Sequence, residues 1–323
     1  MPTTMSRRVF GILGGMLVCV SVQAQYPTHP VTMIVPFAPG GVADNVARPI
    51  ADAMSRELGQ TIVIENKGGA GGSLGIGQAA RAKADGYTLL MTLSSISILP
   101  EADKILGRKA SYQIDQFLPI ARITADPNLF VVRADAPWKT IEEFVADAKA
   151  HPTKFNYGSS GIYGAMQVPM EMFKAAAGVN ITHIPFTGGG PAIAALMGGQ
   201  VDVVASGPTN ALQHIKSGRL RALGHWGDVP VAALPDLPSL KSRGYDVQFT
   251  QWTGIFAPAA TPVDVIDRLR KSVQKVVADP AVQKTVMTSG SPIEYMDAPE
   301  FAAYWKQDAV AAAAAVKIMG KLE

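Results

Sequence analysis

The sequence predicts a two-lobed α/β protein in which mostly parallel sheets are flanked by helices. Strand-like and helix-like patterns alternate with short connections, which is typical of βαβ units. The alternation forms two series, each with a Gly-rich loop after one of its strands, and a helix-only tail follows. The simplest arrangement is two lobes with a cleft between them, joined by strands that cross near residues 129 and 250.

The first residues are predicted to be an export signal. Two arginines at 7–8 precede an apolar stretch at 9–22, and small residues before Gln25 suit cleavage after Ala24. The apolar stretch has about 14 residues, whereas a membrane-spanning helix needs roughly 20. Residues 1–24 are therefore expected to be a signal peptide that leaves an exported mature chain. A partial twin-arginine match leaves the export route open.

Cysteine and charge exclude several classes of partner. The single cysteine, Cys19, lies inside the signal, so the mature chain has no disulfide and no thiolate metal site. Val18 before it, in place of a small residue, argues against a lipid anchor. Loss of the two signal arginines leaves 27 basic against 26 acidic residues. This near-neutral balance lacks the excess of positive charge that is typical of proteins that bind nucleic acid or an anionic membrane.

The elements of the first series follow from apolar runs and helical periodicity. Strands are expected at 31–36, 62–65 and 88–91, and helices at 42–58 and 73–83. In the second series, the run Thr140-Ile141-Glu142-Glu143 reads as a capping box at a helix start. The strands expected there are 129–133, 156–158, 183–185, 201–206 and 221–224, and the later helices are 165–176, 190–197 and 209–217.

The tail is predicted to be three helices, at 262–278, 280–289 and 298–320, each with an early proline. A helical tail usually packs back on an earlier domain. We therefore expect lobe 1 to comprise residues 25–128 plus 251–323 and lobe 2 to comprise residues 129–250. About 299 mature residues suffice for two modest α/β domains.

Two Gly-rich loops are the strongest candidates for a binding site. Residues 35–44 and 184–191 both follow a strand and precede a helix, where bare backbone N–H groups and the helix dipole favour an anion without any Lys or Arg. Ligands of such sheets sit at the carboxyl ends of strands. The candidate ligand residues in these loops are Phe37, Ala38, Pro39, Gly40, Gly41, Thr187, Gly188, Gly189 and Gly190.

Each candidate also has a purely structural interpretation. For the glycines the alternative is a role as turn residues only, and for Phe37 it is core packing in place of the cleft wall. Asp44 lies four residues before Arg48, so an intrahelical pair competes with a ligand contact. Thr187 either donates its hydroxyl to a ligand or caps the helix after it. Ser159 faces the cleft or caps a strand end.

The chain resembles the periplasmic solute-binding proteins of tripartite tricarboxylate transporters, the Bug family, over essentially all of residues 25–323. The resemblance rests on several motifs in the expected order: Tyr26-Pro27, Val35-Pro36-Phe37, Pro39-Gly40-Gly41, Asp44 with Arg48, Glu65-Asn66-Lys67, Gly69-Ala70-Gly71-Gly72, Asp85-Gly86-Tyr87-Thr88-Leu89-Leu90, Gly188 with Gly190-Pro191, Gly199-Gln200-Val201-Asp202, Leu234-Pro235-Asp236, and Trp252 with Ala257-Pro258.

The resemblance implies a type 2-like clamshell, a periplasmic location, and capture of a small organic carboxylate for delivery to membrane permease subunits. It also implies that the two loops hold the ligand through backbone amides and bridging waters. No cofactor and no metal is expected, and the protein is expected to be a monomer. Two departures concern the second lobe. Tyr163 stands where the family usually has glycine and Gln167 where it usually has histidine, so both join the candidate ligand residues. The family's common arginine is missing around 228–230.

Enzymatic interpretations have weaker support. Residues 71–77 are Gly-rich but fail the G-x-G-x-x-G register, and residues 157–161 lack the first glycine of a G-x-S-x-G elbow around Ser159. The five histidines show no metal-ligand spacing. We therefore expect no enzyme. The alternatives are a periplasmic binding protein that signals to a membrane sensor kinase and, less favoured, a serine hydrolase using Ser159. Dicarboxylates, tricarboxylates, amino acids and aromatic acids all remain possible ligands.

Overall fold

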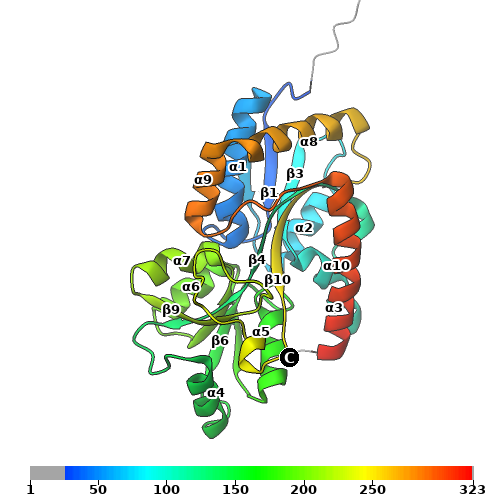
Figure 1. The fold of residues 1–323 in the computed structure, drawn as a ribbon. Coiled ribbons are helices and arrows are strands. Elements are labelled where there is room, and N and C mark those ends of the chain that lie inside the picture. The colour runs from blue at the N-terminus through cyan, green and yellow to red at the C-terminus, as the bar shows by residue number, and fades with distance from the viewer. Residues whose placement is uncertain (1–25, 322–323) are drawn as a thin grey trace, which may run out of the picture.

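The computed structural model describes residues 26–321, which form two lobes, each built on one sheet (Figure 1). The predicted signal peptide lies outside the described residues. The six strands of the upper sheet are, in spatial order, β11 (Met296–Asp297), β4 (Phe117–Pro127), β10 (Thr250–Pro258), β3 (Thr88–Leu93), β1 (Val31–Val35) and β2 (Ile62–Asn66). The five strands of the lower sheet are β7 (Thr182–Pro185), β6 (Asn156–Ser159), β8 (Val203–Ser206), β5 (Leu129–Arg133) and β9 (Leu220–His225).

Helices cover both faces of each sheet, and the central strands are therefore buried on both sides. One core of the upper lobe joins the sheet to α1 (Val42–Leu58), α8 (Val263–Ala278) and α9 (Pro280–Ser289), and the other joins it to α2 (Ser73–Ala80), α3 (Ser95–Ile105) and α10 (Ala298–Met319). In the lower lobe, α4 (Ile141–Ala150) and α5 (Gln167–Ala177) cover one face, and α6 (Gly189–Met197) and α7 (Pro208–Lys216) cover the other. Short 3₁₀ turns lie at Ala70–Gly72, Ile114–Gln116 and Lys241–Arg243.

Local signals set several of these boundaries as expected. The apolar positions of α1 repeat at helical spacing and are buried, and the helix ends at Gly59 in the left-handed conformation. At the start of α4, the Thr140 hydroxyl accepts a hydrogen bond from the Glu143 amide at 3.2 Å. The Glu143 carboxylate accepts from the Lys139 amide and not from the Thr140 amide, so the Thr140 cap is present without the reciprocal bond of the predicted capping box.

The sheets are mixed, not mostly parallel. Strand β1 runs parallel to β2 and β3, and β6 runs parallel to β7 and β8. The strands that connect the lobes run antiparallel to their neighbours: β10 against β3 and β4, and β5 against β8 and β9. Strand β4 continues through Asn128 into β5 of the other sheet, and β10 brings the chain back. Because β4 leads from the upper lobe to the lower lobe and β10 leads back beside it, the two strands run antiparallel.

The sequence patterns missed α3 and β4. Helix α3 is buried on most sides and contains Pro100, so it has no clear polar face to mark it as a helix. Strand β4 is long and is interrupted by a register shift against β10. The tail packs back as expected: α10 runs beside α3 and reaches down to α5 in the lower lobe (Figure 1).

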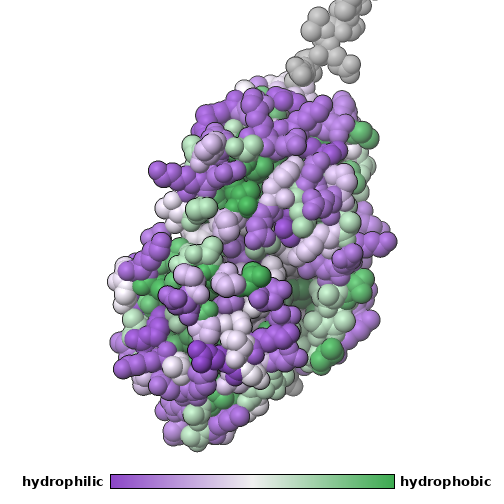
Figure 2. Space-filling view, in the orientation of Figure 1, coloured by the Kyte–Doolittle hydropathy of each residue, from purple (hydrophilic) through white to green (hydrophobic). Residues whose placement is uncertain are grey.

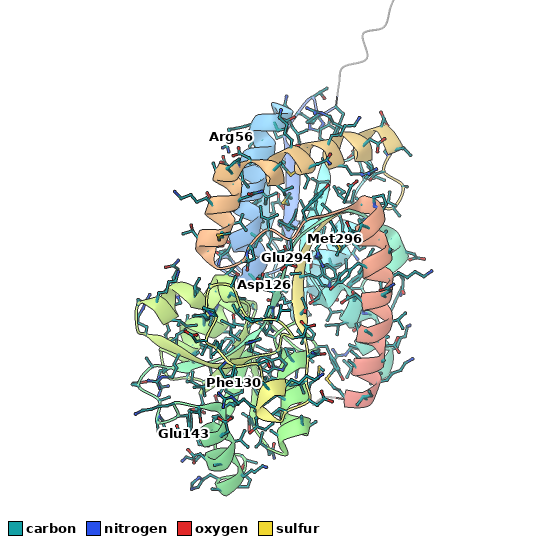
Figure 3. The ribbon with its side chains drawn as sticks, viewed as in Figure 1. Arg56, Asp126, Phe130, Glu143, Glu294 and Met296 are labelled. Carbon is teal, nitrogen blue, oxygen red and sulfur yellow. The ribbon has the colours of Figure 1, made fainter. Side chains whose placement is uncertain are left out.

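The connections between the lobes form a waist at the level of Asp126 (Figure 3). Asp126 is the penultimate residue of β4 and pairs with Gln251 of β10. Burial raises the pKa of the Asp126 carboxyl to about 7, and the negative charge of Glu294 acts in the same direction. The crossover positions predicted near residues 129 and 250 therefore lie at this waist.

The visible surface is mostly hydrophilic, with small and separated hydrophobic areas (Figure 2). Among residues 26–321, none of the helices combines the length and the hydropathy needed to cross a bilayer.

Candidate ligand-binding site

The first Gly-rich loop connects the carboxyl end of β1 to the start of α1. Gly40 has φ +77°, a left-handed conformation that favours glycine, and a Cβ added there would meet nothing within 4 Å. Gly41 is the N-cap of α1, with φ −82° and ψ 171°, and no side chain caps the helix. Only Gly40 therefore needs glycine for its backbone conformation, while Gly41 leaves the helix start bare.

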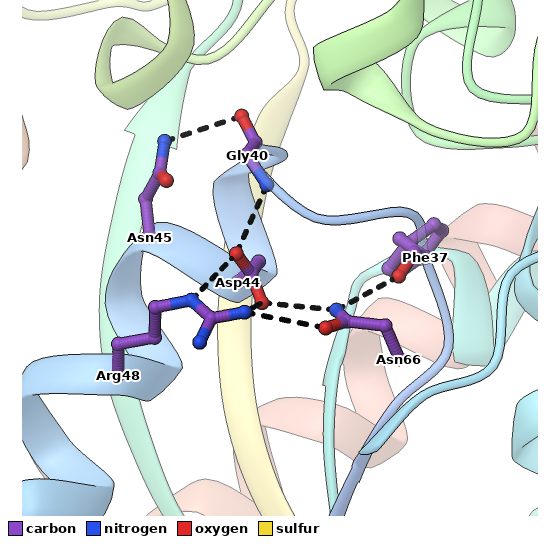
Figure 4. Close-up of polar contacts among 6 residues, drawn as sticks. All are labelled: Phe37, Gly40, Asp44, Asn45, Arg48 and Asn66. Atoms are coloured by element: carbon purple, nitrogen blue, oxygen red, sulfur yellow. Dashed lines mark hydrogen bonds and ion pairs between the residues drawn. The ribbon is translucent and has the colours of Figure 1, made fainter. Parts of the chain in front are cut away.

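The Asp44 side chain holds this loop in place through hydrogen bonds (Figure 4). Its carboxylate accepts hydrogen bonds from the Gly40 amide at 2.9 Å, from Arg48 at 2.8 and 2.9 Å, and from Asn66 at 2.9 Å. Burial would raise the pKa of Asp44, but these hydrogen bonds together hold it below its usual range. The intrahelical pair with Arg48 is thus present, and the Gly40 amide is engaged within the chain.

The second Gly-rich loop has the same design. It follows β7, and Gly188 is the N-cap of α6, again with no side-chain cap. The first N–H groups of a helix have no acceptor inside the helix, so they are available to an external group. Gly188 and Gly189 are buried, and Thr187 is exposed.

The structure brings the two loops into direct contact. The Ala38 amide donates to the Thr187 carbonyl at 3.2 Å. A Cβ on Gly190 would lie 2.7 Å from the Pro39 carbonyl oxygen, and one on Gly188 would lie 2.9 Å from the Ala38 nitrogen. Bare backbone is therefore required for this close approach of the lobes.

Gly41 faces the start of α6. A Cβ on Gly41 would point at the Gly189 nitrogen, 3.5 Å away, and at the Gly190 nitrogen, 3.8 Å away. The dipoles of α1 and α6 thus present their positive ends to one small region. We refer to the region bounded by Gly41, Gly189 and Gly190 as the cradle.

A second contact between the lobes lies beside the cradle. A Cβ on Gly161 would lie 2.5 Å from the Gly71 nitrogen, so these two loops also touch through glycine. Phe37 is buried, and its ring lies against Gly72, where an added Cβ would be 3.1 Å away. Phe37 therefore belongs to the core, and its predicted place in the cleft wall stays a prediction.

Ser159, Gln167 and Tyr163 form a buried network in lobe 2. The Ser159 hydroxyl lies 2.6 Å from His183 Nε2 and also bonds to both the amide and the carbonyl of Gly161. Gln167 Nε2 lies 3.0 Å from His183 Nδ1, and Gln167 Oε1 accepts from the Tyr163 amide at 2.5 Å. Burial lowers the pKa of His183 to about 4, so the ring is neutral at pH 7.

Tyr163 connects the lobes from a strained backbone. Its φ is +54°, in the region that favours glycine, and its side chain is buried. The Tyr163 hydroxyl donates to the Gly320 carbonyl at 2.7 Å, beyond the end of α10. This residue therefore ties the second lobe to the C-terminal helix.

A cavity of about 410 Å³ lies next to the contact of the loops. Lobe 1 contributes Leu99, Arg108 and Lys109, and lobe 2 contributes Tyr163 and Thr187. The lining of this cavity thus contains two predicted ligand residues, Tyr163 and Thr187, together with cationic side chains that the sequence patterns did not single out. Within residues 26–321, three or more His, Cys, Asp or Glu side chains nowhere gather in a way that suits a metal ion.

Comparison with known proteins shows which family has this sequence and this two-lobed fold. A family model described as the tripartite tricarboxylate transporter family receptor matches residues 46–320. The periplasmic binding protein BugD is 37% identical, with a TM-score of 0.87 over 91% of this chain and 99% of that one.

Two further structures contain ligands. MatC from Rhodopseudomonas palustris, solved with bound malate, is 31% identical, with a TM-score of 0.84 over 90% of this chain and 99% of that one. An R. palustris protein solved with adipate is 25% identical, with a TM-score of 0.85 over 92% of this chain and 99% of that one. The chain belongs to the tripartite tricarboxylate transporter receptor family, a group of two-lobed periplasmic solute-binding proteins.

Proposed function

We propose that this protein is a periplasmic receptor that captures a small organic carboxylate between its lobes and delivers it to the membrane permease subunits of a tripartite tricarboxylate-type transporter. The observation that carries the proposal is the meeting of two uncapped helix starts, α1 and α6, at the cradle. Two relatives solved with malate and adipate support a dicarboxylate as the first ligand to test.

Capture follows from the geometry of the loops. In the structure the loops already touch, so a ligand enters when the lobes part at the waist, and closure then surrounds it. Residues 25–128 plus 251–323 and residues 129–250 are proposed to be the two bodies that move. The protein acts as a monomer after cleavage at Ala24, and it needs no cofactor.

The carboxylate is held by neutral donors. These are the first amides of α1 and α6, the Thr187 hydroxyl, and bridging waters. A hydrogen bond to a charged acceptor contributes roughly 1.5–3 kcal/mol. Arg48 is the nearest cation to the loop, but its guanidinium is already bidentate on Asp44. The role of Asp44 is to position the loop rather than to contact the ligand.

A thermal-shift screen of the mature protein with malate, adipate, citrate and an aromatic acid tests the proposal. A ligand that binds only the folded state adds RT ln(1 + [L]/Kd), about 2.7 kcal/mol at a hundredfold excess over Kd. At least one acid is expected to raise Tm, with a micromolar Kd by calorimetry. A panel in which every acid leaves Tm unchanged contradicts the proposal.

Delivery to a permease is distinguished from signalling by an uptake measurement. Cells that lack this protein are expected to lose uptake of the acid identified in the screen. If uptake persists and only a transcriptional response to that acid is lost, the sensor interpretation is correct, since the same closed lobes can engage either partner.

The contact of Ser159 with His183 is the one observation that favours a hydrolase. A general base works best with a pKa near the working pH, whereas burial lowers that of His183 to about 4. The Ser159 side chain is also fully buried and engaged in its own turn. An ester screen with Ser159→Ala as the control decides: turnover that the variant abolishes supports the hydrolase.

A further inference from the structure

One chain of hydrogen bonds in lobe 2 uses the side chains of Ser159, Gln167 and His183 completely. Helix α5 and strand β6 lie beside each other in the lower lobe (Figure 1), and β7 pairs with β6. Every nitrogen and oxygen of these three side chains has a hydrogen-bond partner inside the protein. A ligand could reach these side chains only by replacing one of those bonds.

The Tyr163 amide fixes the orientation of the Gln167 side chain. A backbone N–H group can only donate, so the atom that faces it at 2.5 Å is the oxygen of Gln167. The NH₂ group of Gln167 therefore points the other way, to His183 Nδ1 at 3.0 Å. The same NH₂ group also hydrogen-bonds to the Tyr157 hydroxyl, which donates its own proton to Glu171.

The orientation of Gln167 decides which nitrogen of His183 carries the proton. Nδ1 accepts from the NH₂ group, so in the neutral ring the proton lies on Nε2. Nε2 then donates to Ser159 Oγ at 2.6 Å. The ring is neutral at pH 7 because burial lowers the pKa of His183 to about 4, with the charge of Lys174 acting in the same direction and that of Glu171 against it.

The Ser159 hydroxyl holds the backbone of Gly161. Because its oxygen already accepts from His183, its own proton goes to the Gly161 carbonyl at 3.1 Å, and the Gly161 amide donates back to the oxygen at 3.1 Å. Gly161 has φ +126°, and a Cβ added there would lie 2.5 Å from the Gly71 nitrogen of lobe 1. The conformation of Gly161 therefore decides whether the two lobes can meet at this point.

The same tautomer does not suit a serine hydrolase. The histidine base of such an enzyme accepts the serine proton on a ring nitrogen that carries no hydrogen. Here the nitrogen that faces Ser159 is the protonated one, so the hydrogen bond runs from His183 to the serine.

We propose that Gln167 and His183 are positioning residues of the closed state and not ligand contacts. Gln167 fixes the tautomer of His183, and that tautomer makes Ser159 hold the Gly161 backbone where it meets lobe 1. The effect of these residues on affinity rests on the proposed carboxylate-binding function, whereas the tautomer of His183 is independent of any ligand.

NMR of the mature protein, labelled with ¹⁵N in its five histidines, measures the tautomer directly. The His183 signals are assigned through nuclear Overhauser contacts with the Tyr157 ring, whose centroid lies 4.9 Å from that of the imidazole. At pH 7.5, Nε2 is expected to carry the proton and Nδ1 to carry none. A neutral ring protonated on Nδ1, or a charged ring, overturns the inference.

Gln167→Glu tests whether residue 167 controls the ring. The variant keeps an acceptor for the Tyr163 amide and removes the NH₂ group that donates to Nδ1. Because the added carboxylate favours a proton on Nδ1, the titration of His183 is expected to move to higher pH. The control is Gln200→Glu, at an exposed glutamine of the same lobe, which leaves the titration unchanged. A titration of His183 that Gln167→Glu does not move overturns the role of Gln167.

Ligand affinity should become pH-dependent in the same variant. While His183 is charged, both ring nitrogens carry protons and Nε2 still donates to Ser159. When the ring loses a proton as the pH rises, the new carboxylate keeps the remaining proton on Nδ1. Nε2 must then accept the Ser159 proton, and the bond to the Gly161 carbonyl is lost. The other ionisable groups around the ring are the same in both proteins: Tyr157, Glu171 and Lys174.

Calorimetry at pH 6 and pH 9, with the acid that binds tightest in the screen, measures this effect. The ratio of Kd for Gln167→Glu to Kd for the original protein is expected to rise about tenfold or more between the two pH values. The same ratio for Gln200→Glu should stay constant. A ratio for Gln167→Glu that is equal at both pH values overturns the positioning role, and a ratio that is equal and high means that Gln167 contacts the ligand. If no acid binds, the proposed function fails, and the NMR measurements still decide the tautomer.

Discussion

Replacing Gly41 by alanine adds one methyl group, which should weaken ligand binding without destabilising the fold. The new Cβ would point at the Gly189 and Gly190 nitrogens, 3.5 and 3.8 Å away, where a carboxylate oxygen is expected to lie. Loss of two hydrogen bonds to a charged acceptor corresponds to about 3–6 kcal/mol. Since about 1.4 kcal/mol is a factor of ten, Kd should rise roughly 10² to 10⁴-fold.

The same substitution should leave the fold intact. Gly41 has φ −82°, which alanine adopts readily, and the contacts of the added Cβ are ordinary. Gly→Ala at a compatible position stabilises by about 0.4–1 kcal/mol through the unfolded state. Tm measured without ligand is therefore expected to stay the same or rise slightly.

Gly40→Ala is the matched control and should behave in the opposite way. Its φ of +77° makes alanine cost about 1–2 kcal/mol, so Tm should fall. Its amide already donates to Asp44, so the direct loss of ligand contacts should be smaller. Calorimetry on both variants and the original protein, with the acid that binds tightest in the screen, measures the change in Kd. A Gly41→Ala protein that binds within threefold of the original refutes the cradle.

Three further predictions address charge, pH and closure. Arg48→Gln should lower the free energy of unfolding by about 1–3 kcal/mol, because buried Asp44 loses a hydrogen-bonding partner. The affinity for the ligand should stay within about threefold. Loss of ligand binding at unchanged stability contradicts the neutral-donor site. Because the pKa of folded Asp126 is about 7, above its unfolded value, its ionisation in the unfolded chain lowers stability as pH rises from about 4 to 7. Asp126→Asn should therefore match the original in urea unfolding at pH 4 and exceed it by on the order of 3 kcal/mol at pH 8; an equal difference at both pH values contradicts this. Tyr163→Phe loses the hydrogen bond to Gly320, so small-angle scattering without ligand should give a larger radius of gyration that malate reverses; an unchanged radius means that this contact does not favour closure.

Local sequence patterns predicted those parts of the fold that local interactions decide. Helix α1 was predicted with the observed bounds, because its apolar positions repeat at helical spacing between two glycines. The cap at Thr140 was predicted from the local Thr-x-x-Glu motif, which needs only neighbouring residues. Helix α3 was missed, because burial on most sides removes the polar face that marks a helix. The mixed sheets were missed, because the direction of β10 depends on the path of the chain between the lobes.

The candidate site was predictable only in outline. Gly-rich turns between strand and helix predicted two helix starts, and the structure adds that these lie in contact. Nothing in the sequence distinguishes Gly40, which needs a positive φ, from Gly41, which faces α6. The partner of Ser159 was also hidden, because His183 lies on the neighbouring strand and is distant in sequence.

A crystal structure of the mature chain with malate tests the central claim most directly. One carboxylate should lie between α1 and α6, with its oxygens about 2.7–2.9 Å from the amide nitrogens of Gly41, Gly189 or Gly190. The Arg48 guanidinium should remain on Asp44. Malate bound instead to Arg48, or in the neighbouring cavity beside Arg108 and Lys109, would contradict the claim that neutral donors at two helix starts hold the ligand.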